Sequence, residues 1–345
     1  MHSVYHHNVG PLKVVEGRPA YWATYGAIAL AVLLISVFTE PSRFGDFHAY
    51  VLYLDGLVHY PSPNWMYFEV FSNLYMLGSH WLVQSVFSAV VFAHYLLSIF
   101  FVLALGAAFP PRRTPWPTLL FIFAMLGPLL AFVTMRATPA YFLVAIGVRY
   151  AIDRRPAAWL CLAAAALFHI SALLAAPPMA LLYFERHLPA ILRSGQSRRY
   201  YLLLALAIVA VGAVLPYASS SVTSLIQAIP VISKYDAYTD SASAETQIGH
   251  YIFLAFVSLL TVAFLAAQRG AEAKLNMFVL ASFALYVVMF FSASPIAAFR
   301  QAPFWAMPMI AALPWGRLGL NRATMPVFIV LCVGLFLFQF KQVYI

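Results

Sequence analysis

Long apolar stretches, separated by short polar segments, follow one another along almost the whole chain. A helix needs about 20 mainly apolar residues to cross the hydrocarbon core of a bilayer, and many of these stretches reach or approach that length. The pattern predicts an all-α, polytopic integral membrane protein with about eleven transmembrane helices, forming a single transmembrane domain over residues 1–345. We expect the spans near residues 20–38, 81–107, 117–134, 138–151, 157–171, 172–184, 200–217, 250–267, 277–295, 302–314 and 324–340.

Composition supports this class. Hydrophobic residues make up 63% of the chain and charged residues 9%, and the mean hydropathy is +0.85, whereas a soluble domain carries roughly 25% charged residues. The N-terminal segment lacks the short apolar region and small-residue cleavage site of a signal peptide, so the first span is expected to be an uncleaved anchor. Both cysteines, Cys161 and Cys332, fall within predicted spans, so the sequence indicates neither a disulfide framework nor a Cys-x-x-Cys metal site.

The net charge of +9 could indicate a nucleic-acid partner, but the positions of the basic residues indicate membrane topology instead. With the N-terminus in the cytoplasm, 15 of the 20 Lys and Arg residues fall on the cytoplasmic side, as the positive-inside rule requires. The other side has seven of the eleven acidic residues and two long connections, residues 39–80 and 218–249, in which we expect short amphipathic helices. Since loops often carry function, the working site is expected on this outer face.

Two similar stretches, "MRATPAYF" and "FRQAPFWA", each place an arginine three residues before a proline. Thr138 is the expected N-cap and Pro139 the expected first residue of a helix after Arg136, and Pro303 is expected to open another after Arg300. A helix N-terminus offers unpaired N–H groups, and an arginine adds a planar fork of donors that matches phosphate oxygens. Two such corners could clamp one diphosphate. The alternative, that each arginine extends to lipid headgroups, stays open.

Other polar residues lie in apolar or loop surroundings. His169 is expected at the outer end of the fifth span, either facing a cavity or hydrogen-bonded to a neighbouring helix. Glu69 has apolar and aromatic neighbours, so it is either a partly desolvated carboxylate or an acid facing water. Asp46 precedes a segment that predicts a helix along the membrane surface, and is either a ligand contact or a cap. Tyr235 and Tyr238 favour an aromatic belt over a sugar platform.

The order of these features resembles the EpsG family, which is grouped with the Wzy-type polymerases of bacterial exopolysaccharide and O-antigen assembly. The resemblance covers most of the chain. It departs from the family pattern at Ala137, where a Gln commonly follows the arginine, and at Val70, where a Pro commonly follows the glutamate. The resemblance to the family rests on these features of the sequence: Asp46 with Tyr50, Glu69 in "EVFSNL", Arg136 before a returning helix, "FHISALL" around His169, "KYDAY" at 234–238, and Arg300 in "FRQAPFW".

The resemblance implies a glycosyltransferase that joins undecaprenyl-diphosphate-linked oligosaccharide repeat units at the periplasmic face of the bacterial inner membrane. Its partners would be that lipid-linked oligosaccharide, membrane lipid, and a flippase and a chain-length regulator of the same pathway, with no nucleic acid. The implied catalytic residues are His169, Glu69, Arg136 and Arg300, and the implied substrate contacts are Asp46, Tyr50, Thr138, Gln301, Tyr235 and Tyr238.

The chemistry of such a reaction assigns roles to these side chains. Departure of a lipid diphosphate needs positive charge, which the two arginines would supply. His169 is favoured as the base because the ordinary pKa of histidine lies near 6.5, and Glu69 is expected to orient the acceptor sugar. The sequence has no Asp-x-Asp or His-Asp cluster suited to a divalent ion. We therefore expect a metal-independent enzyme without a cofactor.

Two other function classes fit parts of the pattern. One is a membrane glycosyltransferase of the GT-C type that moves a single sugar from a polyprenyl monophosphate, with Asp46 as its main base. The other is a flippase or transporter of lipid-linked glycans. Transporters typically have charged or broken helices near mid-membrane, whereas the polar features of this chain lie at one membrane face.

Overall fold

The computed structural model describes residues 18–60, 69–184, 197–214, 248–267, 273–292 and 295–344. In this part of the chain the regular structure is helical, and the one extended pairing is an isolated bridge between Phe44 and Tyr344. The prediction of an all-α, polytopic membrane protein is confirmed. Five described helices are long and apolar enough to cross a membrane: α1 (Arg18–Phe38), α5 (Val86–Ala108), α14 (Ile248–Ala267), α15 (Ala273–Ser292) and α18 (Met325–Val343).

The remaining expected spans correspond to shorter apolar helices. One of them, the expected span at 172–184, is divided between a 3-10 turn, η2, and α9. Several of these helices are shorter than the hydrocarbon core is thick, so the number of crossings stays a prediction. They are α6 (Trp116–Phe132), α7 (Ala137–Ile152), α8 (Ala157–Phe168), η2 (Ile170–Ala175), α9 (Ala176–Phe184), α11 (Ser197–Val214) and α17 (Pro303–Ala311).

The connection at 39–80 contains η1 (Pro41–Arg43), α2 (Phe47–His59) and the greater part of α4 (Val70–Val83). The expected start of the second span at residue 81 is wrong, because α4 continues to Val83 and a separate helix, α5, follows. Gln84 adopts a left-handed conformation with φ 62°, which ends α4. Ser85 then caps α5 by accepting a hydrogen bond from the Ser88 backbone N–H. Local backbone geometry therefore separates the loop helix from the membrane helix.

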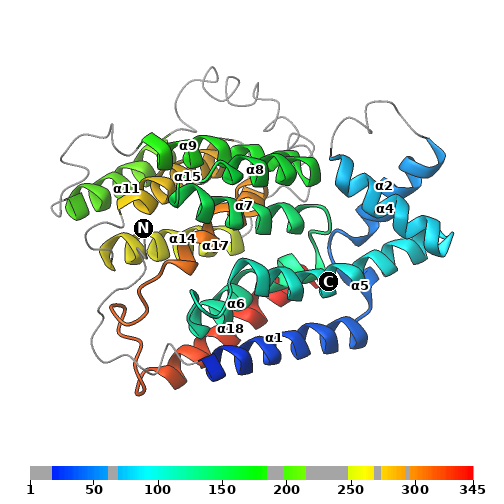
Figure 1. The fold of residues 1–345 in the computed structure, drawn as a ribbon, viewed down its shortest axis with the longest axis horizontal. Helices are drawn as coiled ribbons and strands as arrows, with labels where there is room; N and C mark the ends of the chain where they lie inside the picture. Colours follow the sequence, from blue (N-terminus) through cyan, green and yellow to red (C-terminus); the bar gives the residue numbers. More distant parts are fainter. Residues whose placement is uncertain are drawn as a thin grey trace. The chain divides into compact units, whose positions relative to one another are not determined.

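Contacts divide the chain into two compact units. The first consists of Met1–Leu143, Leu167–His169 and Trp315–Ile345, and the second of Val144–Ala166 and Ile170–Pro314. In the first unit α6 packs against α1 and α18, and α5 packs against α1 (Figure 1). Ser36 of α1 donates to the Ser98 hydroxyl of α5 at 2.7 Å. Such polar contacts between apolar helices are common in membrane proteins, where packing alone supplies no hydrophobic driving force.

Aromatic residues join three chain segments at one end of the first unit. The Phe44 ring stacks on Phe132 at the end of α6, with centroids 5.3 Å apart, and meets the Tyr344 ring edge-on at 5.2 Å. The Gly45 backbone N–H donates to the Val343 carbonyl at 3.0 Å. The segment after α1 and the ends of α6 and α18 therefore lie together, and α2 begins at this end of the unit.

The two helices of the first loop are held by an apolar core. They pack against α5 and against each other (Figure 1). The exposed side of α2 has His59, whose Nδ1 lies 3.0 Å from Asp55 Oδ1. Because this core fixes both helices, their polar side chains have defined positions. The buried members of this apolar core are Phe47, Tyr50, Leu54, Leu57, Met76, Ala89, Val90, Ala93, Leu97 and Met135.

In the second unit α15 packs against α9, α11 and α16 (Figure 1). The helix α16 (Pro295–Gln301) is followed by Ala302, and α17 begins at Pro303 as expected. Arg300, expected in the connection before this helix, instead lies in the last turn of α16. The reason is that Pro295 opens a short helix of its own, which continues to Gln301.

Candidate functional site

The first turn of α4 is the centre of a polar cluster in the first unit. Glu69 directly precedes this helix and adopts a left-handed conformation with φ 58° and ψ 43°. This conformation costs a residue with a side chain roughly 1–2 kcal/mol and is found preferentially at functional positions. The Glu69 side chain is 4% exposed. The interpretation of Glu69 as an acid facing water is therefore wrong, because the fold encloses its carboxylate.

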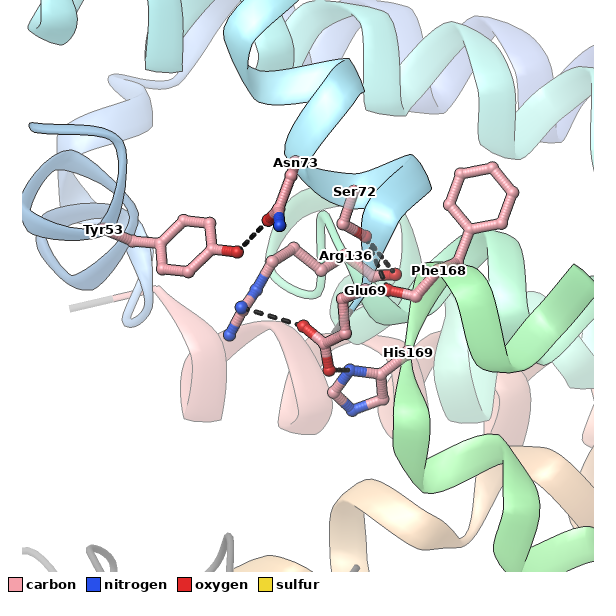
Figure 2. Close-up of polar contacts among 7 residues, drawn as sticks. All are labelled: Tyr53, Glu69, Ser72, Asn73, Arg136, Phe168 and His169. Carbon is pink, nitrogen blue, oxygen red and sulfur yellow. Dashed lines mark hydrogen bonds and ion pairs between the residues drawn. The ribbon is translucent and has the colours of Figure 1, made fainter. Parts of the chain in front are cut away.

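The Glu69 carboxylate connects an arginine and a histidine from two other segments (Figure 2). Arg136 Nη1 donates to Oε2 at 2.9 Å, and His169 Nδ1 lies 2.8 Å from Oε1. The arginine side chain is 23% exposed and the histidine side chain 12%. One enclosed carboxylate thus holds two side chains that are both partly accessible from outside.

Arg136 stands immediately before α7, so its position at a helix N-terminus agrees with the expectation. The helix begins at Ala137, one residue before Thr138, so the assignment of Thr138 as N-cap is wrong. The Thr138 hydroxyl instead donates to the Leu130 carbonyl at 2.7 Å and lies 2.9 Å from the Thr134 hydroxyl. These contacts close the turn between α6 and α7. The expected contact of Thr138 with substrate stays a prediction.

His169 lies between the end of α8 and the start of η2, where the helical hydrogen-bonding pattern changes. The Ser72 hydroxyl donates to the Phe168 carbonyl beside this break at 2.6 Å, and it lies 3.4 Å from the Arg136 carbonyl. Ser72 is buried. A single hydroxyl of α4 therefore connects to the backbone of both segments that supply the arginine and the histidine (Figure 2).

Two tyrosines of α2 surround the arginine. The Tyr53 ring centroid lies 4.2 Å from Arg136 Cζ, and the Tyr50 ring centroid lies 5.8 Å from it. Tyr53 also donates a hydrogen bond to Asn73 Oδ1 (Figure 2). Tyr50, expected to contact substrate, is buried in the core, and Asp46 occupies the N-cap position of α2 without a side-chain capping bond.

The surroundings of Arg136 keep its guanidinium charged. Burial alone would lower the pKa of Arg136, but the charge of Glu69 and the neighbouring tyrosines raise it above the ordinary value. Burial raises the pKa of Tyr53, although the nearby arginine opposes this. The guanidinium is therefore a permanent cation. His169 Nδ1 faces the Glu69 carboxylate.

Sequence reasoning missed Tyr53, Ser72 and Asn73. For Ser72 and Asn73 the sequence did contain a signal, because positions 69, 72 and 73 have the spacing that places side chains on one face of a helix. No local pattern pointed to Tyr53, since its contact with Arg136 joins α2 to the turn between α6 and α7.

The other expected site residues are Arg300, Gln301, Tyr235 and Tyr238. Arg300 and Gln301 belong to the second unit, so the clamp formed by two arginines stays a prediction. Gln301 is buried, and its Oε1 has no hydrogen-bond partner among the described residues. Tyr235 and Tyr238 lie outside the described residues. In the described part of the chain, no group of three or more His, Cys, Asp or Glu side chains could hold a metal ion.

Comparison with known proteins identifies the family. The EpsG family matches residues 24–345, which is nearly the whole chain. No curated protein and no solved structure is significantly similar to the chain. The chain therefore belongs to the EpsG family of Wzy-like polymerases, as the resemblance predicted. Membership indicates an exopolysaccharide polymerase-type glycosyltransferase that uses a lipid-linked oligosaccharide at a membrane.

Proposed function

Because the chain belongs to the EpsG family, we propose that it joins undecaprenyl-diphosphate-linked oligosaccharide repeat units at the periplasmic face of the inner membrane. The growing glycan on its lipid diphosphate is the donor, and a hydroxyl of the incoming lipid-linked unit is the acceptor. The observation that carries this proposal is the contact chain from Arg136 through Glu69 to His169. It combines an anion-binding group with a base that has a fixed orientation.

The reaction needs one proton acceptor and one stabilised leaving group. The acceptor oxygen attacks the anomeric carbon of the donor and forms the new glycosidic bond. The bond from that carbon to the diphosphate oxygen breaks, and its electron pair leaves with undecaprenyl diphosphate. The proton of the acceptor hydroxyl moves to His169 Nε2. This assignment follows from the 2.8 Å contact at Nδ1, which orients the imidazole for transfer at its other nitrogen.

Arg136 is suited to the leaving diphosphate. Glu69 holds one guanidinium nitrogen, while the 23% exposure of the side chain leaves part of the group accessible to a ligand. The adjacent N-terminus of α7 adds partial positive charge in the same place. Such fixed donors act most strongly where negative charge develops during the reaction. The expected contact of Arg300 with a diphosphate stays a prediction.

The geometry supports a role for Glu69 that differs from the expected one. Its two carboxylate oxygens face Arg136 and His169, whereas an acceptor-binding residue would direct them toward the sugar. We assign to Glu69 the orientation of His169 and the stabilisation of the imidazolium that forms when the proton is transferred. A carboxylate next to a catalytic histidine has this function in other enzymes with acid–base catalysis.

A reconstitution experiment tests the proposal. Purified protein receives undecaprenyl-diphosphate-linked repeat units isolated from cells that lack this protein, and the products are separated by size. A ladder with increments of one repeat unit is the expected result. Addition of one sugar from a polyprenyl monophosphate would instead identify a GT-C-type transferase. Movement of the lipid-linked unit across vesicles without any new bond would identify a transporter.

Arginine variants test the assignment of the leaving-group contacts. Arg136→Lys and Arg300→Lys are each expected to lower the rate of chain extension by about 10²–10³, because an ammonium cannot reproduce forked contacts worth roughly 3–4 kcal/mol in the transition state. Arg43→Lys is the matched control, since Arg43 is exposed and forms an exposed ion pair with Glu40 at 3.5 Å. Near-normal extension by a site variant would mean that this arginine contacts lipid headgroups.

A further inference from the structure

Tyr53 has a place in the site that the reaction as described does not use. We propose that Tyr53 is a positioning residue, which holds the Arg136 guanidinium plane in the orientation needed against the leaving diphosphate, and that Asn73 fixes Tyr53 in turn. The inference rests on the proposed function. It concerns a residue of α2 that does not itself touch the reacting atoms.

The contact with Glu69 alone does not fix the plane of the Arg136 guanidinium, so its orientation depends on a second constraint. Arg136 Nη1 is held by Glu69 at 2.9 Å, but Arg136 Nε is buried without a hydrogen-bond partner among the described residues. The contact with Glu69 alone would permit rotation of the planar group about that contact, and the Tyr53 side chain adds a hydrogen-bonding interaction with the arginine. The orientation of the fork therefore depends on what packs against its face.

The Tyr53 ring supplies that packing. Its centroid lies 4.2 Å from Arg136 Cζ, well within the range of cation–π contacts, and Figure 2 shows the side chain extending from α2 toward the guanidinium. The ring cannot easily follow a movement of the arginine, because α2 is anchored in the core through Leu54 and Leu57. A partly desolvated cation is thus held at its edge by a carboxylate and at its face by an aromatic ring.

Asn73 connects the two constraints. The Tyr53 hydroxyl donates to Asn73 Oδ1, and Asn73 is buried in the first turn of α4. The backbone N–H of Asn73 donates to the Glu69 carbonyl at 3.0 Å, so both residues belong to the same helical turn. One turn of α4 therefore contacts the guanidinium directly through Glu69 and indirectly through Tyr53.

Substitutions at Tyr53 separate the ring from its hydroxyl. Tyr53→Leu is expected to lower kcat for chain extension by about 30-fold, which corresponds to a lost contact of about 2 kcal/mol at 1.36 kcal/mol per tenfold. The KM for the lipid-linked donor is expected to change by less than about threefold, because the loss concerns charge that develops in the transition state. Tyr53→Phe keeps the ring face, and its kcat is expected to stay within about threefold of that of the unsubstituted protein.

The hydrogen bond to Asn73 is tested by a double-mutant cycle. Tyr53→Phe and Asn73→Ala both remove the bond between these residues, and Tyr53→Phe also removes the interaction of the hydroxyl with Arg136. Each is expected to cause a small loss in kcat, and the double variant is expected to lose no more than Tyr53→Phe alone. Additive losses would show that Asn73 acts independently of Tyr53 and would overturn its assigned role.

Tyr75→Leu is the matched control for the removal of a tyrosine ring. Tyr75 packs against the same apolar core as Tyr53, and its hydroxyl donates to the Ala93 carbonyl of α5. We expect this variant to extend chains within about threefold of the normal rate per mole of folded enzyme. An equal loss in Tyr75→Leu and Tyr53→Leu would mean that core packing alone is responsible and would overturn the inference.

The remaining outcomes distinguish this inference from the proposed function. If the unsubstituted protein extends chains and Tyr53→Leu does so at the same rate, the positioning role is wrong while the polymerase assignment stands. If Tyr53→Phe loses as much as Tyr53→Leu, the hydroxyl and not the ring face is required, which also overturns the role. If the unsubstituted protein produces no ladder, the proposed function itself fails.

Discussion

The contact between Glu69 and His169 allows the loss in kcat of Glu69→Gln to be predicted. The substitution keeps the size and the hydrogen-bonding capacity of the side chain and removes its charge. An amide can still accept a hydrogen bond from Arg136 Nη1, so the cluster is expected to fold. It cannot stabilise the imidazolium that forms when His169 accepts the proton of the acceptor hydroxyl.

The magnitude follows from the geometry. With His169 Nδ1 2.8 Å from Oε1, the two charge centres lie about 4 Å apart, and at an effective dielectric constant near 20 their attraction is about 4 kcal/mol. Arg136, 2.9 Å from the other oxygen, compensates part of the carboxylate charge. We therefore take about 3 kcal/mol, which at 1.36 kcal/mol per tenfold predicts a loss of roughly 10²-fold in kcat.

The assay is the initial rate of chain extension by purified variants on one lipid-linked substrate between pH 5.5 and 8.5. Asp55→Asn is the matched control, because Asp55 makes a comparable contact with His59 at 3.0 Å while both side chains are about half exposed. An exposed pair of this kind contributes little, so the control is expected to stay within about twofold of the normal rate.

The pH profile gives an independent reading. Because His169 must be neutral to accept the proton, the rate is expected to fall as the pH falls. Glu69→Gln is expected to lower the rate across the whole pH range. His169→Gln is expected to lose at least about 10²-fold at every pH. A Glu69→Gln variant with a near-normal rate would refute the assigned role.

Two further predictions concern stability and topology. Ser72→Ala removes a buried hydroxyl that donates to the Phe168 carbonyl at 2.6 Å, so the free energy of unfolding, measured by thermal unfolding, should fall by roughly 1–3 kcal/mol. Ser79→Ala removes a local bond to the Tyr75 carbonyl and should lower the free energy of unfolding by less. Equal losses in the two variants would contradict the special role of Ser72. Topology is tested with Tyr60→Cys and Ala323→Cys, made separately in a background without the native cysteines, because both positions are exposed. An impermeant thiol reagent applied from the periplasm should label the first variant and not the second. The reverse pattern would place the site on the cytoplasmic face.

The sequence by itself determined the class of the protein and the positions of most of its helices. Hydropathy is a local property, and a run of apolar residues must be helical in a bilayer because each backbone polar group needs a partner within its own segment. The proline at 303 likewise marked the start of α17. Helix ends were less accurate where backbone geometry decided them, as at Gln84, whose left-handed conformation separates α4 from α5.

The tertiary structure decided which polar residues work together. Glu69 and Arg136 are separated by 67 positions in the chain, and their contact exists because α4 packs its first turn against the turn between α6 and α7. The sequence identified Glu69, Arg136 and His169 one by one, but it assigned the carboxylate to the sugar and did not indicate Tyr53. Contacts of this kind depend on how helices pack, and packing is set by side chains from several segments at once, so no periodicity within a single segment reports it.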